Sequence, residues 1–485
     1  MVNRSRTPQR TQFVCRECGH ESARWLGFCP APGCGSSLPL QEVDVVARVG
    51  NRSSWLTGSG ERPRELSQLA SEDRSRFALP SEEFNRVLGG GIVPGSVALL
   101  AGEPGVGKST LLLQLARYLS ESGRQVAYVS GEESPHQIKL RSERLGFAGD
   151  GVFLVSDTDV DLALSNLDEC QPLLVIVDSI QTLFTQDAPA GPGSVAQVRE
   201  CGLKLLQWAK QRNVPVFLAG HMTKDGSLAG PRVLEHMVDL VMYLEAQDVS
   251  SYRILRSGKN RFGSTTEIGV FEMTGQGLVE VPDPSQALLA QRYERAVGAS
   301  LVPALEGTRP LMLEIQALTS PAFAPVPRRV ANGVDYNRLL MLAAVASRRC
   351  GLELGGQDII VNVAGGFRVN EPAADLGIIL ALASSLYNRP LDPQLVAVGE
   401  VGLSGELRTV PQMERRITEA ARLGLSKCIL PENAQDDVTR TSEMEPVFVR
   451  TVRQALRASL GSAGKAGVSI SEQEYERDID ELGFG

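Results

Sequence analysis

The segment from position 102 to position 110 carries the complete phosphate-binding pattern Gly-x4-Gly-Lys-[Ser/Thr]. Its residues are Gly102, Glu103, Pro104, Gly105, Val106, Gly107, Lys108, Ser109 and Thr110. The glycines of such a loop let backbone N–H groups turn toward a triphosphate, Lys108 reaches the β and γ phosphates, and the Ser109 hydroxyl ligates Mg²⁺. An apolar run precedes the loop and a helical pattern follows it, so that the positive end of the helix faces the phosphates. The segment predicts ATP and Mg²⁺ as cofactors.

Carboxylates follow two further apolar runs that have the character of buried strands. Asp178 ends the run at 173–177, where it can hold a water of the Mg²⁺ shell opposite the phosphate-binding loop. Glu132 and Glu133 follow the neighbouring run, where one of them can orient the attacking water beside the γ-phosphate. We expect Glu132 to do so, because the first carboxylate after a strand is less able to swing away, and Glu133 is the alternative. The predicted catalytic residues are Lys108, Glu132 and Asp178.

His221 follows another apolar run and opens the polar, glycine-rich stretch at 222–231. A polar residue in this place can sense the γ-phosphate and reorganise the stretch that follows it. A histidine at the end of a strand can also be an ordinary hydrogen-bonded residue. The sequence leaves both interpretations open.

Four cysteines lie close together near the N-terminus, as Cys-x2-Cys, ten residues, and Cys-x4-Cys. They are Cys15, Cys18, Cys29 and Cys34. Two such pairs on glycine-containing turns let four thiolates surround one tetrahedral Zn²⁺, and a module this small has too little core to fold without the metal. Four thiolates leave no open coordination position, so we expect a structural zinc ribbon. A structural disulfide pair is the alternative, which a reducing compartment disfavours.

The elements that must position these residues are apolar runs that alternate with helical stretches. Alternation of this kind predicts a mostly parallel sheet flanked by helices, and closely spaced strands at its end predict an antiparallel extension. We therefore expect an α/β chain with five parts. These are a zinc ribbon at 1–40, a linker at 41–79, an ATPase domain at 80–282, a second α/β domain at 287–460 and a flexible acidic tail at 461–485.

The composition limits the classes of function. The chain has 485 residues and a formal net charge of −8, from 57 acidic and 49 basic residues. This charge argues against a protein that coats nucleic acid by bulk charge, so contacts with nucleic acid need local basic patches. The N-terminus lacks the apolar segment of a secretory signal, and no run reaches the roughly 18 apolar residues of a membrane span. We expect a cytoplasmic protein without a membrane partner.

A motif with two cations and one aromatic residue lies between late strands of the ATPase domain. It consists of Lys259, Asn260, Arg261, Phe262 and Gly263. Such cations suit either a phosphate of DNA or a triphosphate bound to the next subunit. The motif alone leaves these two roles open.

With this motif, the cysteine pairs, the phosphate-binding loop and the stretch after His221, the chain resembles the RadA (Sms) family of bacterial recombination and repair ATPases, which have a RecA-like core. The resemblance runs from Cys15 to about Leu460. It implies a DNA-dependent ATPase that drives branch migration and helicase-like processing of recombination intermediates together with RecA. It also implies a homo-oligomeric ring, for which we expect six subunits, with ATP at the interfaces and single-stranded or branched DNA as a partner.

The part at 287–460 resembles the proteolytic domain of Lon, whose mechanism needs a serine beside a lysine. In the matching segments this chain has Ala373 in place of the serine and Glu414 in place of the lysine. We therefore expect a scaffold without peptidase chemistry, which serves assembly and DNA contact. Five arginines form a candidate basic cluster for DNA, or alternatively a solvated helix face. They are Arg328, Arg329, Arg338, Arg348 and Arg349.

Two other functions stand beside the DNA-dependent motor. An ATP-gated switch or adaptor would bind partners according to its nucleotide state without moving DNA. An ATP-dependent protease would need the missing serine and lysine. Stimulation of ATP hydrolysis by single-stranded DNA separates the motor from the switch, and degradation of casein would indicate the protease.

Overall fold

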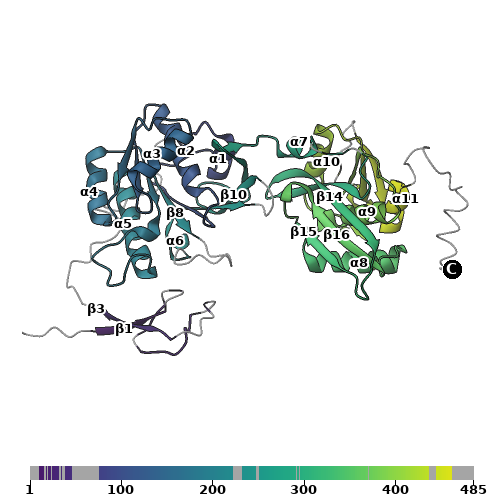
Figure 1. Ribbon diagram of the computed structural model, residues 1–485, viewed down its shortest axis with the longest axis horizontal. Helices are drawn as coiled ribbons and strands as arrows, with labels where there is room; N and C mark the ends of the chain where they lie inside the picture. Colours follow the sequence, from purple (N-terminus) through teal and green to yellow (C-terminus); the bar gives the residue numbers. More distant parts are fainter. Residues whose placement is uncertain are drawn as a thin grey trace, which may run out of the picture. The chain divides into compact units, whose positions relative to one another are not determined.

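The computed structural model describes the chain at 10–15, 18, 20–22, 24–31, 34, 39–45, 76–221, 232–246, 251–290, 292–293, 295–369, 371–435, 438 and 444–460. Most of the predicted linker, the stretch after His221 and the predicted tail lie outside these residues. The chain divides into two compact units (Figure 1). The first consists of Met1–Ala246 with Ser251–Glu280, and the second of Gln247–Ser250 with Val281–Gly485.

A three-stranded antiparallel sheet forms the N-terminal part of the described chain (purple in Figure 1). Its strands are β1 Arg10–Val14, β2 Glu21–Ser22 and β3 Gln41–Val45, in the order β2-β1-β3. The hydrophobic cluster beside it contains two of the predicted zinc ligands, Cys15 and Cys29, together with Leu40. So small a cluster supplies little of the free energy of folding, and a further stabilising contact is needed here.

A nine-stranded sheet is the centre of the first unit, in the order β12-β11-β10-β9-β4-β8-β7-β5-β6. The strands are β4 Val97–Gly102, β5 Val126–Ser130, β6 Val152–Val155, β7 Leu174–Asp178, β8 Val216–His221, β9 Leu240–Ala246, β10 Tyr252–Asn260, β11 Ile268–Thr274 and β12 Gly277–Glu280. The neighbours from β9 to β6 pair in parallel, and those from β9 to β12 pair antiparallel. The expected mostly parallel sheet with an antiparallel extension is confirmed.

Helices cover both faces of this sheet (Figure 1). They are α1 Glu82–Leu88, α2 Lys108–Glu121, α3 Pro135–Arg144, α4 Val160–Cys170, α5 Val195–Arg212 and α6 Arg232–Met237, with a 3₁₀ turn at Ile180–Thr182. The apolar side chains of α1, α2 and α3 join the hydrophobic cluster on one face, and those of α4, α5 and α6 join the cluster on the other. Because both faces are covered, β4, β5 and β7 are buried along their whole length and read as continuous apolar runs. Side-chain oxygens of Ser134, Asp159 and Ser194 cap the first turns of α3, α4 and α5.

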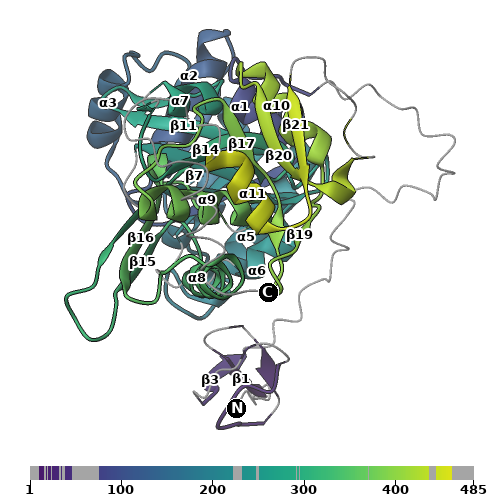
Figure 2. The same ribbon diagram turned by 90° about the vertical axis from the view of Figure 1, so that its right-hand side faces the viewer.

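A seven-stranded mixed sheet is the centre of the second unit, in the order β15-β16-β14-β13-β17-β20-β21. Its strands are β13 Ala299–Glu306, β14 Arg309–Pro321, β15 Arg329–Asn332, β16 Gln357–Val363, β17 Leu395–Ala397, β20 Lys427–Pro431 and β21 Glu445–Val449. Figure 2 shows β15 and β16 side by side, where they pair in parallel. A separate antiparallel pair joins β18 Glu400–Val401 to β19 Leu407–Arg408.

The helices of the second unit are α7 Pro284–Leu289, α8 Tyr336–Cys350, α9 Asp375–Leu386, α10 Met413–Arg422 and α11 Val452–Leu460. Short 3₁₀ turns lie at Ala364–Gly366, Pro372–Ala374 and Glu432–Ala434. Helix α9 is apolar and buried over most of its length because it packs against β13 and β14. Among the helices in the described ranges, none is long and apolar enough to cross a membrane.

Candidate nucleotide and metal sites

The carboxyl ends of four parallel strands meet on one side of the nine-stranded sheet. Gly102 at the end of β4 pairs with His221 at the end of β8, and Asp178 at the end of β7 pairs with Ser130 at the end of β5. Glu132 lies two residues after β5. The order β4-β8-β7-β5 therefore brings the predicted phosphate-binding loop, the candidate sensor and both predicted catalytic carboxylates to one place, which we call the nucleotide end of the sheet.

The phosphate-binding loop joins β4 directly to α2. Gly105 and Gly107 have φ angles of 79° and 116°, in the left-handed region that favours glycine. A Cβ atom at Gly107 would lie 2.6 Å from the Met273 side chain, and one at Gly102 would lie 2.6 Å from the Leu244 carbonyl oxygen. Backbone conformation therefore favours glycine at 105 and 107, and the close approach of the Leu244 carbonyl requires it at 102. The first N–H groups of α2 face the loop, which is the arrangement that binds phosphate.

Lys108 is the first residue of α2, and its side chain is buried. Its Nζ donates hydrogen bonds of 2.9 Å to the carbonyl oxygens of Gly102 and Glu103. Burial lowers the pKa of Lys108, while the charges of Asp178 and Glu132 act in the opposite direction. The ammonium group thus lies over the loop within the field of both predicted catalytic carboxylates. A phosphate group at the loop would compete with the two carbonyls for its protons.

Asp178 is buried at the end of β7. Its Oδ2 accepts a 2.6 Å hydrogen bond from the Tyr128 hydroxyl on β5. Its Oδ1 is buried and has no hydrogen-bond partner among the residues that the structure describes. A buried carboxylate oxygen of this kind fits a water of a Mg²⁺ shell, which supplies the missing donor. The donor set beside the loop therefore suits Mg²⁺ with ATP.

Glu132 is half-buried and held by two neighbours at the same oxygen. Its Oε1 accepts a 2.5 Å hydrogen bond from the Ser179 hydroxyl and lies 2.7 Å from His221 Nε2. The hydrogen bond with His221 is the largest cause of a lowered pKa of Glu132, and the bond with Ser179 adds to it against the effect of burial. Glu132 is therefore an ionised carboxylate beside the lysine of the loop.

Glu133 points to a different partner, although it is the next residue. Its carboxylate forms an ion pair with Arg141 on α3, and its backbone carbonyl accepts a hydrogen bond from Ser130. The structure thus separates the two candidates for orienting the attacking water. Glu132 belongs to the nucleotide end of the sheet, and Glu133 belongs to the contact with α3.

The motif Lys259–Gly263 lies at the opposite end of the sheet from the phosphate-binding loop. Asn260, the last residue of β10, pairs with Leu240 at the start of β9, and Leu240 pairs with Ala98 near the start of β4. We call this side of the sheet the motif end. Because β4 runs from the motif end to the nucleotide end, the motif is separated from the chain's own loop by the length of that strand.

The two cations of the motif have different surroundings. Lys259 Nζ donates hydrogen bonds of 2.7, 3.2 and 2.8 Å to the carbonyl oxygens of Glu235, His236 and Val238 at the end of α6. Burial is the largest cause of a lowered pKa of Lys259. The side chain of Arg261 is 57% exposed and makes one 3.3 Å contact with Asp239. Lys259 therefore holds the end of α6 against β10, whereas the guanidinium group of Arg261 is exposed to solvent.

The remaining residues of the motif hold it against α1. Asn260 Nδ2 donates to the Val87 carbonyl oxygen, and the Phe262 amide donates to Asn260 Oδ1. A Cβ atom at Gly263 would lie 2.9 Å from the Cα atom of Gly89, so that only glycine permits this approach. The shape of the motif is fixed by contacts within the chain.

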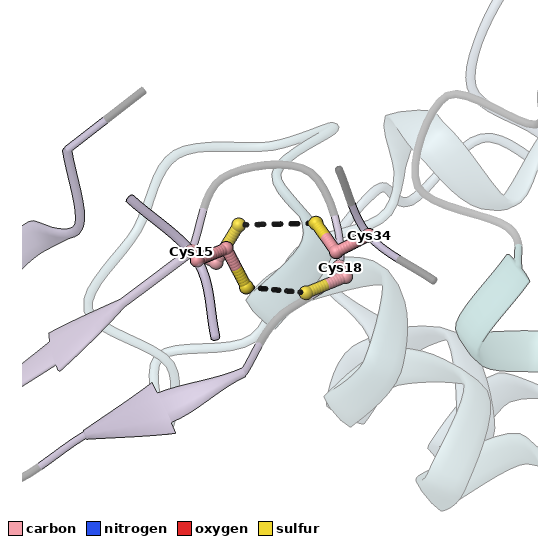
Figure 3. Close-up of side chains that lie close together, drawn as sticks. Cys15, Cys18 and Cys34 are labelled. Carbon is pink, nitrogen blue, oxygen red and sulfur yellow. Dashed lines mark hydrogen bonds between the residues drawn. The ribbon is translucent and has the colours of Figure 1, made fainter. Parts of the chain in front are cut away.

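The four N-terminal cysteines converge on one point. Their Sγ atoms all lie within 4.8 Å of one another, with 3.8 Å between Cys15 and Cys34 and 3.4 Å between Cys18 and Cys29. Figure 3 shows the sulfur atoms of Cys15, Cys18 and Cys34 directed toward one another. Zn–S bonds of about 2.3 Å in a tetrahedron place sulfur atoms about 3.8 Å apart. The thiols therefore fit one Zn²⁺, and none of the four is joined in a disulfide.

Comparison with known proteins places this geometry in a family. Residues 62–227 match the family described as AAA domain, and residues 336–434 match the family described as subunit ChlI of Mg-chelatase. The chain is 46% identical to DNA repair protein RadA of Halalkalibacterium halodurans and 45% identical to DNA repair protein RadA of Bacillus subtilis, each over 455 residues. Both alignments cover 93% of this chain and 99% of the relative. The chain belongs to the RadA family.

The AAA-domain match of this RadA-family chain includes the phosphate-binding loop, so the chain is an ATP-hydrolysing enzyme. The match to the AAA-domain family thus supports the ATPase core that the sequence motifs predict. Among solved structures, a KaiC-like protein from Pyrococcus horikoshii is similar over 43% of this chain and 99% of its own, with 22% identity and a TM-score of 0.36.

In the second unit of the RadA-family chain, apolar packing fills the segment that resembles the Lon nucleophile region. Ala373 is buried in a hydrophobic cluster that includes Met413 of α10. Glu371 accepts two 2.6 Å hydrogen bonds from the guanidinium group of Arg416, which is 1% exposed. Glu414 lies in the first turn of α10. Ala373 thus lies in hydrophobic packing close to a buried ion pair, and the expected lack of peptidase chemistry stays a prediction.

The five arginines of the candidate basic cluster do not all face outward. Arg338 forms a bidentate ion pair with the buried Asp375, which also accepts the Val401 amide. Arg329 donates to backbone carbonyl oxygens, including that of Leu354. Arg348 is exposed near the end of α8. Arg329 and Arg338 therefore bond to groups of the second unit itself, and fewer arginines remain for the positive patch expected from the sequence.

Sequence reasoning missed three side chains that hold the site together. Tyr128 lies within an apolar strand, where an aromatic residue is typical of core packing, and only the pairing of β5 with β7 shows its contact with Asp178. Ser179 directly follows Asp178, and this position beside a predicted catalytic residue could have indicated its contact with Glu132. Asp239 accepts hydrogen bonds from the Val97 amide, Lys210 and Arg261, and a lone carboxylate before a strand gave no such indication.

Proposed function

We propose that this chain is a DNA-dependent ATPase of recombinational DNA repair, which drives branch migration and helicase-like processing of recombination intermediates together with RecA. Its relatives at 45–46% identity bear the name DNA repair protein. The observation that carries the motor is the placement of two polar sites at opposite ends of one sheet. The hydrolytic residues gather at the nucleotide end, and the exposed Arg261 lies at the motif end.

The nucleotide end supports a division of labour in hydrolysis. Lys108 and the loop amides would hold the phosphates, and Ser109 and Asp178 would hold Mg²⁺. When bound there, Mg²⁺ would supply neutralisation of the phosphate charge. Glu132 orients the attacking water, and its Oε2 is the oxygen available for this because Ser179 and His221 both contact Oε1.

His221 acts as the sensor of the γ-phosphate in this proposal. Its Nδ1 is buried without a partner in the described part of the chain, while its Nε2 contacts Glu132. A γ-phosphate that attracts the imidazole would release Glu132 Oε1 and change the position at which the stretch 222–231 begins. Hydrolysis and the movement of that stretch are then coupled through one hydrogen bond.

In a ring of subunits, Arg261 can contact the triphosphate that is bound to the neighbouring subunit. Because the length of β4 separates the motif from the chain's own loop, Arg261 can serve an ATP site only in another copy of the chain. Lys259 is occupied by three carbonyl oxygens, so we assign the contact with the neighbouring triphosphate to Arg261. A homo-oligomer of six subunits with single-stranded or branched DNA at its centre would use this arrangement at every interface.

The other parts of the chain have supporting roles in this proposal. The four thiols of the N-terminal ribbon hold a structural Zn²⁺. The second unit is a scaffold without peptidase activity, because Ala373 offers no hydroxyl group and is buried in hydrophobic packing. Exposed arginines such as Arg348 contribute to DNA binding.

The second candidate is an ATP-gated switch or adaptor. The contact between His221 and Glu132 favours it, because a γ-phosphate that draws the imidazole away would change the conformation of the chain with its nucleotide state, whether or not DNA is present. Such a protein would bind partners according to its nucleotide state without moving DNA. Stimulation of hydrolysis by DNA is the property that separates it from the motor.

The test measures native mass and ATP hydrolysis together, with and without single-stranded DNA, and extension of a three-stranded joint in the presence of RecA. The motor predicts stimulation by DNA and joint extension, both lost in Arg261→Ala although the oligomer persists. Arg212→Ala is the matched control, since Arg212 is 56% exposed and pairs with one carboxylate on the same unit. ATP-dependent partner binding without stimulation by DNA would favour the switch. Full activity of Arg261→Ala in the same oligomer would contradict the interface role.

A further inference from the structure

A buried hydrogen bond links two central strands directly below the nucleotide end. The Tyr128 hydroxyl on β5 donates to Asp178 Oδ2 on β7 over 2.6 Å, and the side chains are 2% and 5% exposed. The parallel pairing sets Tyr128 opposite Ile176, so Tyr128 and Asp178 are diagonal neighbours on one face of the sheet. Ile176 and Tyr128 belong to the hydrophobic cluster that also contains α2, so this is the face covered by the helix after the phosphate-binding loop.

The second oxygen of Asp178 is a buried acceptor without a donor. Oδ1 has no hydrogen-bond partner among the described residues, although leaving a buried carboxylate oxygen unsatisfied is costly. Lys108, whose ammonium group lies in the field of Asp178, donates instead to the carbonyl oxygens of its own loop. A group from outside the protein is therefore needed to complete the site.

We propose that Tyr128 is a positioning residue for the metal site: its hydroxyl fixes the Asp178 carboxylate so that Oδ1 faces the water shell of nucleotide-bound Mg²⁺. The inference rests on the Mg²⁺–ATP part of the proposed function. It is independent of DNA, of RecA and of the assembly. A tyrosine buried in a strand thereby takes part in metal binding without touching the metal.

Physical chemistry favours a neutral donor in this place. The terminal torsion of an aspartate side chain is broad, so an Asp178 carboxylate without Tyr128 would be free to rotate. The nearby Lys108 would then draw the carboxylate into a direct ion pair, which would compete with the water that the metal carries.

The test compares Tyr128→Phe with Tyr118→Phe. Tyr118 lies on α2, behind the same loop, and is the matched control that removes one hydroxyl from the same unit. Mn²⁺ replaces Mg²⁺ as the probe: electron paramagnetic resonance measures Mn²⁺ bound with ADP, and calorimetry measures ADP binding without metal. Since a hydrogen bond to a charged group is lost, Tyr128→Phe should weaken Mn²⁺ binding about tenfold or more. Binding of metal-free ADP should stay within about twofold of the wild type, and Tyr118→Phe should change neither.

Three results would overturn the inference. The first is a Tyr128→Phe protein that binds Mn²⁺ with ADP as the wild type does. The second is an equal loss of metal-dependent and metal-free ADP binding, which would indicate general damage to the unit. The third comes from Asp178→Asn, in which the further change Tyr128→Phe should have no additional effect on Mn²⁺ binding, so that additive losses contradict the link. Stimulation of the wild-type ATPase by single-stranded DNA is measured in parallel, because its absence would count against the motor and leave this inference standing.

Discussion

The two ends of the nine-stranded sheet treat their polar side chains in opposite ways. At the nucleotide end, Asp178 Oδ1 and His221 Nδ1 are buried without partners in the described part of the chain. At the motif end, Lys259 donates to three carbonyl oxygens, and Asp239 accepts from the Val97 amide and two cations. Two buried atoms at the nucleotide end are thus available to a ligand, whereas the groups named at the motif end are hydrogen-bonded within the chain.

This difference separates activity from stability. Where a substitution at the nucleotide end removes an atom that has no partner in the described chain, such as Asp178 Oδ1, the free energy of unfolding should change little and hydrolysis should change greatly. A substitution at the motif end removes hydrogen bonds already present in the folded chain, so the free energy of unfolding should fall. Arg261 is the exception at the motif end, because its guanidinium group is largely exposed.

The largest expected effect is the loss of hydrolysis in Lys108→Ala. The ammonium group is the one buried cation over the phosphate-binding loop in the described chain, so its removal should lower kcat at least about a hundredfold. Steady-state phosphate release measures this, with thermal unfolding of the same sample as a check on folding. Lys139→Ala is the control, because Lys139 makes an exposed ion pair with Glu143 on α3. Equal rates of hydrolysis in the two variants would contradict the assignment of the nucleotide end as the site of hydrolysis.

The next effect distinguishes two adjacent carboxylates. Glu132→Gln should lower kcat about a hundredfold or more and preserve ATP binding, because the amide keeps the shape but is a poor base. Glu133→Gln should preserve most of the hydrolysis, since Glu133 pairs with Arg141 on α3. Single-turnover hydrolysis and binding of a fluorescent ATP analogue measure the two properties. The reverse pattern would make Glu133 the residue that orients the water.

Much of the nucleotide end could be predicted from the sequence because its signals are local. A phosphate-binding sequence between an apolar run and a helix indicates nucleotide binding. Polar residues that follow parallel strands lie at the same edge of a sheet. Lys108, Asp178, Glu132 and His221 all lie where this rule places them. The mostly parallel sheet follows from the same alternation of runs and helices.

The motif end could not be predicted in the same way because its meaning depends on strand register. Lys259 and Arg261 are equivalent cations in the sequence, and only the antiparallel pairing of β10 with β9 brings Lys259 to the end of α6. Arg338 presents the same problem in the second unit, where the buried Asp375 turns it inward. The sequence shows charge, whereas the tertiary contacts decide which charges remain exposed.

A smaller effect should follow from the unequal cations of the motif. Lys259→Ala leaves three carbonyl oxygens at the end of α6 without their shared donor, and because the site is partly exposed the free energy of unfolding should fall by about 1–2 kcal/mol. Arg261→Ala should lower it by less than about 0.5 kcal/mol. Urea unfolding of both variants without nucleotide measures the difference. Equal stability of the two would mean that the motif is not braced as its hydrogen bonds indicate.

The smallest expected effect is a shift of the acid side of the pH profile in His221→Ala. The hydrogen bond with His221 is the largest cause that lowers the pKa of Glu132 below its ordinary value of 4.5, so the wild type keeps an ionised Glu132 until the pH falls below that value. Without His221, burial opposes only the weaker causes, and the pKa of Glu132 rises. The acid limb of kcat/KM should therefore move to higher pH.

The sign for stability is the same. A carboxyl group whose pKa is lowered on folding stabilises the folded chain above the unfolded pKa, and this contribution is lost as the pH falls through the folded pKa. His221→Ala should therefore unfold more readily than the wild type at pH values above 4.5, where that advantage is complete, and the difference should shrink as the pH falls below this value. Glu133→Gln is the control and should leave the acid limb of kcat/KM unchanged. An acid limb that is identical in His221→Ala and the wild type would mean that another group sets the ionisation of Glu132, and the proposed coupling between sensor and base would lose its physical basis.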